Sequence, residues 1–399
     1  MNNWQKVRLK DVVSILGDGL HGTPKYDESG EYFFINGNNL SDGQIKIKSD
    51  TKRVNVSEYL KHKKDLNDRT LLVSINGTIG NVATYKGERC ILGKSACYFN
   101  ILPGVCKEYI YYILLHDNFQ SYAKNWATGT TIKNVSLKQM REYEFLLPSF
   151  EKQQQIAKIL SSLDDKIELN TQTNHNLEEQ AMAIFKSWFV DFEPFQDGTF
   201  VDSELGQIPA GWRTGVLSEI ADITMGQSPK GSSYNENSEG AVFYQGRAEF
   251  TDRFPTRRLF TTEPKRMAEA GDVLLSVRAP VGDMNIANES CCIGRGLAAI
   301  HAKKDFSSFV FYTMQALKPE LDKYNGEGTV FGCVNKDALN TQKVIIPPDK
   351  IISEFEKIAS SLDQAYLVGF EENMRLAQLR DALLPKLMSG EIDVSEVEV

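Results

Sequence analysis

The sequence EKQQQIAKILSSLDDKIELNTQTNHNLEEQAMAIFKSWFVDFEPF occupies residues 151–195 and decides the architecture of this chain. Its seam positions recur at steps that alternate between four and three: Ile156, Leu160, Leu163 and Ile167, then Asn170 and Asn174, then Leu177, Ala181, Ile184 and Trp188. This spacing is a heptad seam, which keeps one stripe of a helix facing a partner helix. Neither Gly nor Pro interrupts residues 151–191. The pattern therefore predicts one helix, about 50 Å long for roughly 35 residues.

A second segment, residues 350–389, repeats this design. Its apolar seam consists of Phe355, Ile358, Leu362, Ala365, Gly369, Leu376, Leu379 and Leu383. The pair Leu163-Asp164 aligns with Leu362-Asp363, an offset of 363 − 164 = 199 residues. Two related helices form an antiparallel coiled coil if the chain returns on itself. The alternative is two unrelated amphipathic helices on separate cores.

Asparagines interrupt both seams at corresponding places. Asn170 and Asn174 take seam positions in the first segment, and Asn373 matches Asn174 at the same offset, 373 − 174 = 199. A buried Asn in a coiled coil fixes register at a cost in stability. We favour this role over the alternative, in which the helix frays locally and the asparagines are solvated.

The repeat extends beyond the helices. FFINGNNL at Phe33 resembles VFYQGRAEF at Val242, and TLLVSINGTIGNVA at Thr70 resembles DVLLSVRAPVGDMN at Asp272. CILGKSACYF at Cys90 resembles CCIGRGLAAI at Cys291. A duplicated unit of about 200 residues is too long for a solenoid repeat. We expect an α/β (α+β) fold: two tandem mixed α/β domains, separated by two long helices that form an antiparallel coiled coil, with pseudo-twofold symmetry.

The expected domain boundaries follow from the repeat and from the linker between the copies, which is rich in Gly, Pro and Asp. The predicted segments are a first globular domain (1–150), a central helix (151–192), a linker (193–211), a second globular domain (212–350), a C-terminal helix (351–390) and a tail (391–399).

Composition is that of an ordinary globular protein, with 41% hydrophobic and 25% charged residues. No run of about 18 apolar residues could span a membrane, and the N-terminus lacks the apolar core of a signal peptide. We therefore expect a cytoplasmic protein without membrane contact. The six cysteines form no C-x-x-C pair, and with five histidines in the chain a metal site is not expected.

Charge is unevenly distributed along the chain. The net charge is −8, which at first argues against a nucleic-acid partner. However, residues 1–150 carry 20 Lys and Arg against 15 Asp and Glu, a net charge of +5, whereas residues 351–399 carry 4 against 10. Since local basic patches set affinity for DNA, the average over the chain does not exclude it.

Several motifs together resemble one family. SLDDKIELN (162–170), FKSWFVDFEPF (185–195), GQIPAGW (206–212) and LRDALLPKLMSGEI (379–392) are similar to hallmarks of type I restriction–modification specificity subunits, as are GTTIKN (129–134) and the order of the two units. The resemblance covers nearly the whole chain. It implies that each globule is a target recognition domain that reads one half of a bipartite double-stranded DNA target.

The resemblance also implies partners. The two helices, conserved in the family, would set the gap between half-sites and dock two modification (methyltransferase) subunits, which restriction (motor-nuclease) subunits join. S-adenosylmethionine, ATP and Mg would be bound by those partners and not by this chain. The alternative is an assembly scaffold, whose paired helices recruit partners while its globules do not bind DNA.

A free-standing enzyme is a third interpretation, and it needs a catalytic motif. The only Pro-Pro, at 347–348, has the wrong neighbours for the N/D-P-P-Y/F element of an amino-methyltransferase. GERCILGKS (87–95) resembles a Walker A loop, but five residues separate its Gly from Gly-Lys-Ser where four are required. The sequence therefore predicts a chain that is not catalytic by itself.

Candidate DNA-contacting residues lie in loops that recur in both units but differ in side chain. Arg and Lys suit guanine, Asn and Gln suit adenine, and all polar groups can contact phosphates. The predicted residues are Lys25, Asn36, Asn38, Asn76, Lys94, Thr130 and Lys133 in the first unit, and Lys230, Gln245, Arg247, Arg278, Arg295 and Thr329 in the second. TDRFPTRRLF (251–260) could track phosphates or form a solvated strand edge.

A second set of residues is expected at the helix-pair and partner interface. These are Ile156, Leu163, Asn174, Leu177, Trp188, Phe189, Leu362, Leu376 and Leu383. For the aromatic residues that close the first helix, Trp188, Phe189 and Phe192, an interface role competes with a simple core role.

Overall fold

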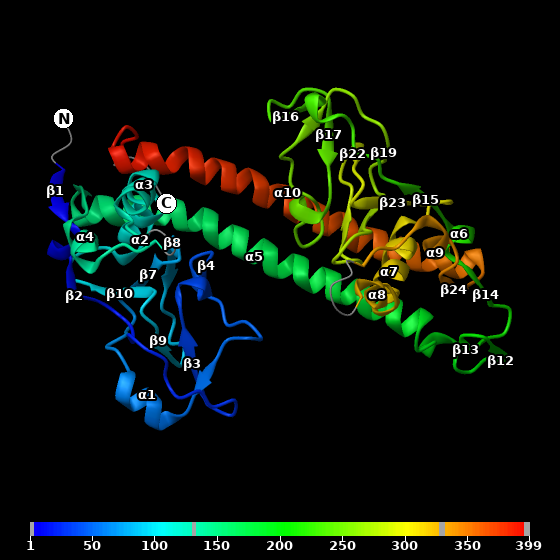
Figure 1. Ribbon diagram of the computed structural model, residues 1–399, viewed down its shortest axis with the longest axis horizontal. Helices are drawn as coiled ribbons and strands as arrows, with labels where there is room; N and C mark the ends of the chain where they lie inside the picture. Colours follow the sequence, from blue (N-terminus) through cyan, green and yellow to red (C-terminus); the bar gives the residue numbers. More distant parts are fainter. Residues whose placement is uncertain (1–3, 130–132, 327–331, 395–399) are drawn as a thin grey trace. The chain divides into compact units, whose positions relative to one another are not determined.

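The computed structural model describes residues 4–129, 133–326 and 332–394. The chain forms two compact units (Figure 1). The first unit consists of Met1–Asn170 and Glu371–Val399, and the second consists of Thr171–Phe370. Both long helices contribute to each unit, so every unit contains one globule and two helical segments.

The first unit is built on a four-stranded antiparallel sheet of order β2-β10-β7-β8. Its strands are β2 (Val13–Asp18), β7 (Thr70–Asn76), β8 (Thr78–Thr84) and β10 (Ala96–Ile101). The first six residues of β7 are buried, because the sheet is covered on both faces and a continuous apolar run suits such a strand. The smaller sheets and the helices are β1 (Gln5–Arg8) with β11 (Glu144–Leu147); β3 (Tyr32–Ile35) with β6 (Arg53–Val54) and β9 (Cys90–Leu92); β4 (Leu40–Ser41) with β5 (Gln44–Ile45); α1 (Val56–His62), α2 (Lys107–Leu115), α3 (Asp117–Trp126) and α4 (Leu137–Glu142).

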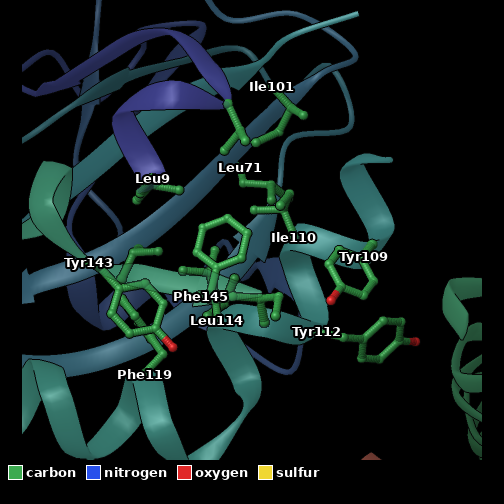
Figure 2. Close-up of a cluster of buried hydrophobic side chains, with 14 of the residues drawn as sticks. Leu9, Leu71, Ile101, Tyr109, Ile110, Tyr112, Leu114, Phe119, Tyr143 and Phe145 are labelled. Atoms are coloured by element: carbon green, nitrogen blue, oxygen red, sulfur yellow. The ribbon is translucent and has the colours of Figure 1, made fainter. Parts of the chain in front are cut away.

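The main core of the first unit lies between this sheet and helices α2 and α3. Leu71 on β7 and Ile110 on α2 are fully buried within it, and so is Phe119 on α3 (Figure 2). The same cluster includes Ile156 and Leu160 from the first long helix, as well as Leu387 from the second. Tyr112 lies at the edge of the cluster with its hydroxyl pointing outward (Figure 2). The core therefore joins the globule to both helices.

The second unit repeats the first. Its four-stranded sheet has the order β15-β23-β20-β21, with strands β15 (Ala221–Met225), β20 (Val273–Ser276), β21 (Met284–Ile286) and β23 (Leu297–Ala302). The other elements are β12 (Phe200–Ser203) with β13 (Gly206–Pro209); β14 (Arg213–Val216) with β24 (Lys343–Ile346); a five-stranded sheet of β16 (Tyr234–Asn235), β18 (Phe260–Thr261), β17 (Ala241–Tyr244), β22 (Cys291–Ile293) and β19 (Met267–Ala268); α6 (Leu217–Ile220), α7 (Ser307–Ala316), α8 (Lys318–Asp322) and α9 (Lys336–Asn340).

The register of the two central sheets confirms the duplication. Leu71 pairs with Thr84 and Phe99 in the first unit, and Val273 pairs with Ile286 and Ile300 in the second. In each unit a serine near the end of the strand, Ser74 or Ser276, accepts a hydrogen bond from the backbone seven residues later, at 2.9 and 3.0 Å respectively. The prediction of two tandem mixed α/β domains is therefore confirmed.

The two predicted long helices are also confirmed. Helix α5 covers Phe150–Phe189 and α10 covers Asp349–Ser389. Their first residues differ by 349 − 150 = 199, the offset read from the sequence.

Within each unit the two helical segments run antiparallel. In the first unit Asp164 bonds to Arg380 at 2.7 Å, and further along α5 Asn170 bonds to Glu372 at 2.7 Å. In the second unit the ring of Phe185 on α5 lies 5.8 Å from that of Phe355 on α10. Earlier on α5, Asn174 packs on Gly369 of α10. Residues with higher numbers on α5 thus contact residues with lower numbers on α10, as in an antiparallel helix pair.

The seam asparagines are buried as expected. Asn170 and Asn174 are 7% and 6% exposed, which excludes the solvated alternative. Asn373 donates to the backbone oxygen of Ile167 at 3.3 Å. A side chain at Gly369 would place its Cβ 2.6 Å from Oδ1 of Asn174, so this glycine makes room for the buried amide. These contacts suit a role in fixing helix register.

Candidate nucleic-acid interface

Loops from distant parts of the first globule meet at one end of its central sheet. We call this set the first loop cluster; it comprises residues 18–20, 35–38, 74–78, 93–96 and 133–135. Backbone bonds hold it together: Leu20 to Leu92 (2.7 Å), Lys94 to Leu20 (3.0 Å), Gly93 to Ile35 (2.8 Å), Ile75 to Ser95 (2.9 Å), Gly77 to Lys133 (3.1 Å) and Val135 to Ile75 (2.9 Å). The Ser95 hydroxyl accepts from Gly37 at 2.8 Å.

An equivalent set of loops meets in the second globule. The second loop cluster comprises residues 226–228, 244–248, 276–280, 294–297 and 332–334. Its bonds are Gln227 to Ile293 (3.0 Å), Gly294 to Tyr244 (2.8 Å), Gly296 to Gln245 (3.1 Å), Val277 to Gly296 (2.9 Å), Ala279 to Gly332 (3.0 Å) and Val334 to Val277 (3.1 Å). Five of these bonds have counterparts in the first cluster, so both clusters are built on one backbone frame.

Glycines allow the loops of each cluster to approach closely. A Cβ on Gly93 would lie 2.1 Å from Oδ1 of Asn36, and one on Gly294 would lie 2.8 Å from Cα of Gln245. Neither separation is tolerated by a real side chain without a shift of the neighbour. Gly93 therefore lets the loop after β9 approach the loop after β3, and Gly294 lets the loop after β22 approach the loop after β17.

Three predicted cations of the first unit project from exposed positions. Lys94 and Lys133 belong to the first loop cluster, and Lys25 lies farther out in the segment after β2. Among the residues that the structure describes, none of the three has a carboxylate within ion-pair distance. Their ammonium groups are thus available to an anion from outside the chain.

The predicted asparagines of the first unit differ in their engagement. Asn36 is half-buried, and its Oδ1 accepts from the Ser95 hydroxyl at 3.0 Å. Asn76 donates to Oδ1 of Asn134 at a long 3.4 Å. Asn38 is exposed, and its backbone oxygen accepts from Lys48 at 3.0 Å. Asn36 therefore organises the loop, Asn38 is exposed at its surface, and Asn76 is half-buried like Asn36.

The predicted DNA contacts of the second unit include three arginines, whereas those of the first unit include none. Arg278 and Arg295 are exposed in the second loop cluster, and Lys230 is exposed farther along the segment after β15. No carboxylate among the described residues pairs with any of these three. Arg247, in contrast, pairs with Asp283. Gln245 is exposed, and its backbone oxygen accepts from Gly296.

Two predicted contacts, Thr130 and Thr329, lie outside the described residues. For the other eleven residues, contact with DNA stays a prediction, because the structure describes only their positions in the fold.

The segment Thr251–Phe260 pairs its arginines with carboxylates of its own unit, and Arg257 and Arg258 remain exposed. Arg253 is 1% exposed and pairs with Asp363 of α10. Arg257 pairs with Glu289, and Arg258 pairs with Glu249, which is itself 4% exposed. All three arginines are bonded to carboxylates of the same unit, so the basic composition of this stretch reflects internal pairing.

The residues expected at the helix interface fall into two groups. Ile156 and Leu383 pack in the core of the first unit, and Phe189, Trp188 and Leu362 pack in that of the second. The ring of Phe189 lies 5.1 Å from that of Phe355, so the aromatic closure of α5 contacts α10. Leu163, Leu177 and Leu376 are half-buried, and Asn174 packs on Gly369.

The sequence interpretation missed one feature at the junction of globule and helix. Tyr112 donates to Asp164 at 2.6 Å, and Tyr312 donates to Asp363 at 2.7 Å. Burial raises the pKa of both phenols, so they remain protonated donors. A signal was present, since both aspartates lie in the repeated Ser-Ser-Leu-Asp and both tyrosines lie in aligned segments.

The comparison with protein families is decisive. The sequence model described as the type I restriction modification DNA specificity domain matches residues 1–179 and again residues 209–379. The chain belongs to this family. Both copies of the internal repeat are matched separately, in agreement with the two units of the structure.

Individual relatives of this specificity family support the assignment over almost the full length. A protein of Methanocaldococcus jannaschii, named "Putative type I restriction enzyme MjaX specificity subunit", is 32% identical over 410 residues, covering 98% of this chain and 94% of the relative. The MjaIX specificity subunit of the same organism is 28% identical and covers 99% and 95%. The crystal structure of a type I S subunit from M. genitalium shares the fold, with a TM-score of 0.61 at 19% identity over 97% and 96% of the two chains.

Membership in the specificity family defines the role in outline. The chain is a DNA-recognition subunit of a type I restriction–modification system, and such subunits are not themselves catalytic. Among the described residues, no group of three or more His, Cys, Asp or Glu is arranged to hold a metal ion. Within those same ranges, no helix is long and apolar enough to cross a bilayer.

Proposed function

We propose that each loop cluster reads one half of a bipartite DNA target. The observation that carries this proposal is the repeated frame: the two clusters share five backbone bonds yet present different side chains. Asn76 in one cluster corresponds to Arg278 in the other, and Lys94 corresponds to Arg295. Since Asn suits adenine and Arg suits guanine, one frame with two sets of side chains can read two different half-sites.

The paired helices are proposed to set the gap and to dock two methyltransferase subunits. Exposed apolar residues on them support a docking role, because such positions are costly to leave in water. In the first unit Leu169, Met374 and Leu379 are 57%, 44% and 48% exposed, and in the second unit Val368 is 52% exposed. Motor-nuclease subunits would complete the complex, and S-adenosylmethionine, ATP and Mg would be held by these partners.

The test of the reader role is adenine methylation across the genome of a host that expresses this chain with its modification subunit. A bipartite methylated motif that disappears when the chain is deleted is the expected result. Replacing residues 1–150 by another such domain should change one half of the motif alone. Methylation that is absent or unaffected by the deletion, despite a folded complex, would favour the scaffold alternative.

The gap function has its own test. One extra heptad inserted in both helices, after Asn170 and after Phe370, lengthens each by about 10 Å. The gap should grow by about three base pairs at about 3.4 Å each, while both half-sites stay the same. Altered half-sites with an unchanged gap would contradict this division of labour.

A further inference from the structure

Each globule joins its helices through the same acidic socket. In the first unit the socket is Asp164 of α5 with Tyr112 of α2, and in the second it is Asp363 of α10 with Tyr312 of α7. The aspartates correspond at an offset of 199 and the tyrosines at an offset of 200. A carboxylate in a partly buried socket needs a positive partner, since an unpaired charge away from water is costly.

In the first unit the positive partner comes from the helices. Arg380 of α10 places Nη1 2.7 Å from Oδ1 of Asp164. On the globule, a Cβ at Gly43 would lie 2.5 Å from the Tyr111 hydroxyl, and φ there is +73°, so this position suits glycine. In this unit the helix, and not the globule, contributes the arginine.

In the second unit the positive partner comes from the globule. Arg253 pairs with Asp363 and lies 3.4 Å from the Tyr312 hydroxyl. Its guanidinium stacks on the rings of Phe311 and Tyr366, at 4.7 and 4.8 Å from their centroids. Its side chain is only 1% exposed, so this arginine is enclosed within the unit.

The two arginines occupy exchanged positions. Gly43 corresponds to Arg253, because the backbone oxygen of each accepts from the equivalent strand residue, Thr84 at 2.9 Å or Ile286 at 2.8 Å. Arg380 corresponds to Ala181 of α5, at 380 − 181 = 199, and Ala181 is fully buried. In the first unit the globule has Gly43 and the helix has Arg380, whereas in the second unit the globule has Arg253 and the helix has Ala181. The arginine that pairs with the aspartate therefore comes from the helix in one unit and from the globule in the other.

We propose that Arg380 and Arg253 are positioning residues that lock the globule of each unit to its own helical segments. This inference rests on the proposed function, because the lock matters for recognition only if the loop clusters read DNA. Breaking a buried pair by removing one partner is costly, and the fork of a guanidinium also fixes orientation. Each lock thereby holds the DNA-reading loops at a fixed distance and angle from the helices of its unit.

A consequence concerns the exchange of globules between related chains. The first unit keeps its arginine in α10, so a replacement for residues 1–150 needs only the tyrosine and a small residue at position 43. The second unit loses its arginine when residues 212–350 are replaced. An incoming globule must then supply an arginine at position 253, or Asp363 is left without a cation.

The experiment uses the full chain with its modification subunit and measures adenine methylation at the cognate motif and at motifs whose gap differs by one base pair. Arg253→Met keeps bulk and removes the charge. We expect the preference for the cognate gap to fall roughly 10- to 100-fold, because small misplacements of reacting groups change reaction rates by such factors. Arg257→Met is the matched control, because Arg257 is an exposed, ion-paired arginine of the same unit; it should leave the preference unchanged.

Moving the arginine from the globule to the helix tests whether it positions the globule or only stabilises the unit. Arg253→Gly should lose the gap preference, and Arg253→Gly combined with Ala181→Arg, which copies the arrangement of the first unit, should restore most of it. If Arg253→Met does not yield folded chain, Arg253→Lys takes its place, since lysine keeps the charge but lacks the planar fork. An unchanged gap preference in the single variants, or no recovery in the double variant, overturns the inference. If the unmodified chain supports no sequence-dependent methylation, the proposed function itself fails instead.

Discussion

Asn76 and Arg278 occupy the same position in the two units. Asn76 is the last residue of β7, and Arg278 lies two residues after the end of β20. Each forms an isolated bridge to the segment before the last short helix of its globule, Asn76 with Asn134 and Arg278 with Cys333. One frame therefore holds an amide in one unit and a guanidinium in the other. Under the proposed function, this difference predicts different base preferences in the two half-sites.

Replacing Arg278 by Asn should change one position of one half-site. A bidentate contact between arginine and guanine contributes about 1–3 kcal/mol of discrimination, so guanine preference at that position should fall by roughly ten- to a hundredfold. The methylated motif in a host that expresses the variant reports it directly. The gap and the other half-site should not change. Arg257→Asn serves as the control, and a variant that weakens every position equally would mean that Arg278 contacts phosphate.

Lys94 and Lys133 should act on affinity without acting on sequence preference. Both are exposed in the first loop cluster, and neither pairs with a carboxylate among the described residues. Removing one lysine that binds a phosphate should lower the slope of log affinity against log salt by about one. Fluorescence anisotropy of labelled DNA with the chain and its modification subunit, at several salt concentrations, measures this slope for Lys94→Gln and Lys133→Gln.

The control for these two variants is Lys86→Gln. Lys86 is an exposed lysine of the same unit, outside the first loop cluster, so the change in net charge is identical. An equal effect of all three substitutions would indicate only a general electrostatic attraction.

Gly294 should be intolerant of a side chain. The added methyl of Gly294→Ala would meet backbone at 2.8 Å, and overpacking of this kind costs about 1–3 kcal/mol. We expect a lower melting temperature together with weakened methylation of targets. Gly231→Ala is the matched control, because a Cβ there meets nothing within 4 Å. Equal behaviour of the two variants would show that the second loop cluster adapts to the extra atom.

The sequence was informative wherever periodicity or duplication governs structure. The heptad seam and the offset of 199 anticipated both helices, and the aligned strand segments anticipated two copies of one sheet. Asn76, Lys94 and Lys133 were predicted from segments that recur in both units, and all three lie in the first loop cluster. Each of these features depends on local pattern, which a single sequence displays.

The role of Arg253 could not be read in the same way. It stands in a basic stretch that looks exposed, yet its partner Asp363 lies 110 residues later in the chain. The equivalent aspartate, Asp164, recruits its arginine from position 380. Because the two units fill one socket from opposite sides, aligning their sequences places Arg253 opposite Gly43 and Arg380 opposite Ala181. The pairing becomes visible only when the globule and helices are seen together.

His301 should make the second unit more stable in mild acid. Its Nδ1 lies 2.6 Å from Oδ1 of the buried Asp272, and this hydrogen bond raises the pKa of His301 above its ordinary value of 6.5. A group with a raised folded pKa contributes stability that is fully present below the unfolded pKa and is lost as the pH rises through the folded pKa. The gain is small, since the side chain is half exposed and screened by solvent.

Melting temperatures of the chain and of His301→Gln, compared at pH 6 and at pH 9, measure this contribution. The wild type should be the more stable at pH 6, and the difference should shrink at pH 9, where the histidine is neutral. His175→Gln is the control, because His175 is an exposed helical residue 3.2 Å from an equally exposed Glu179, so solvent screens the pair and little difference is expected at either pH. An advantage of the wild type that is equal at both pH values would mean that the neutral His301–Asp272 hydrogen bond, and not the charge, stabilises the unit.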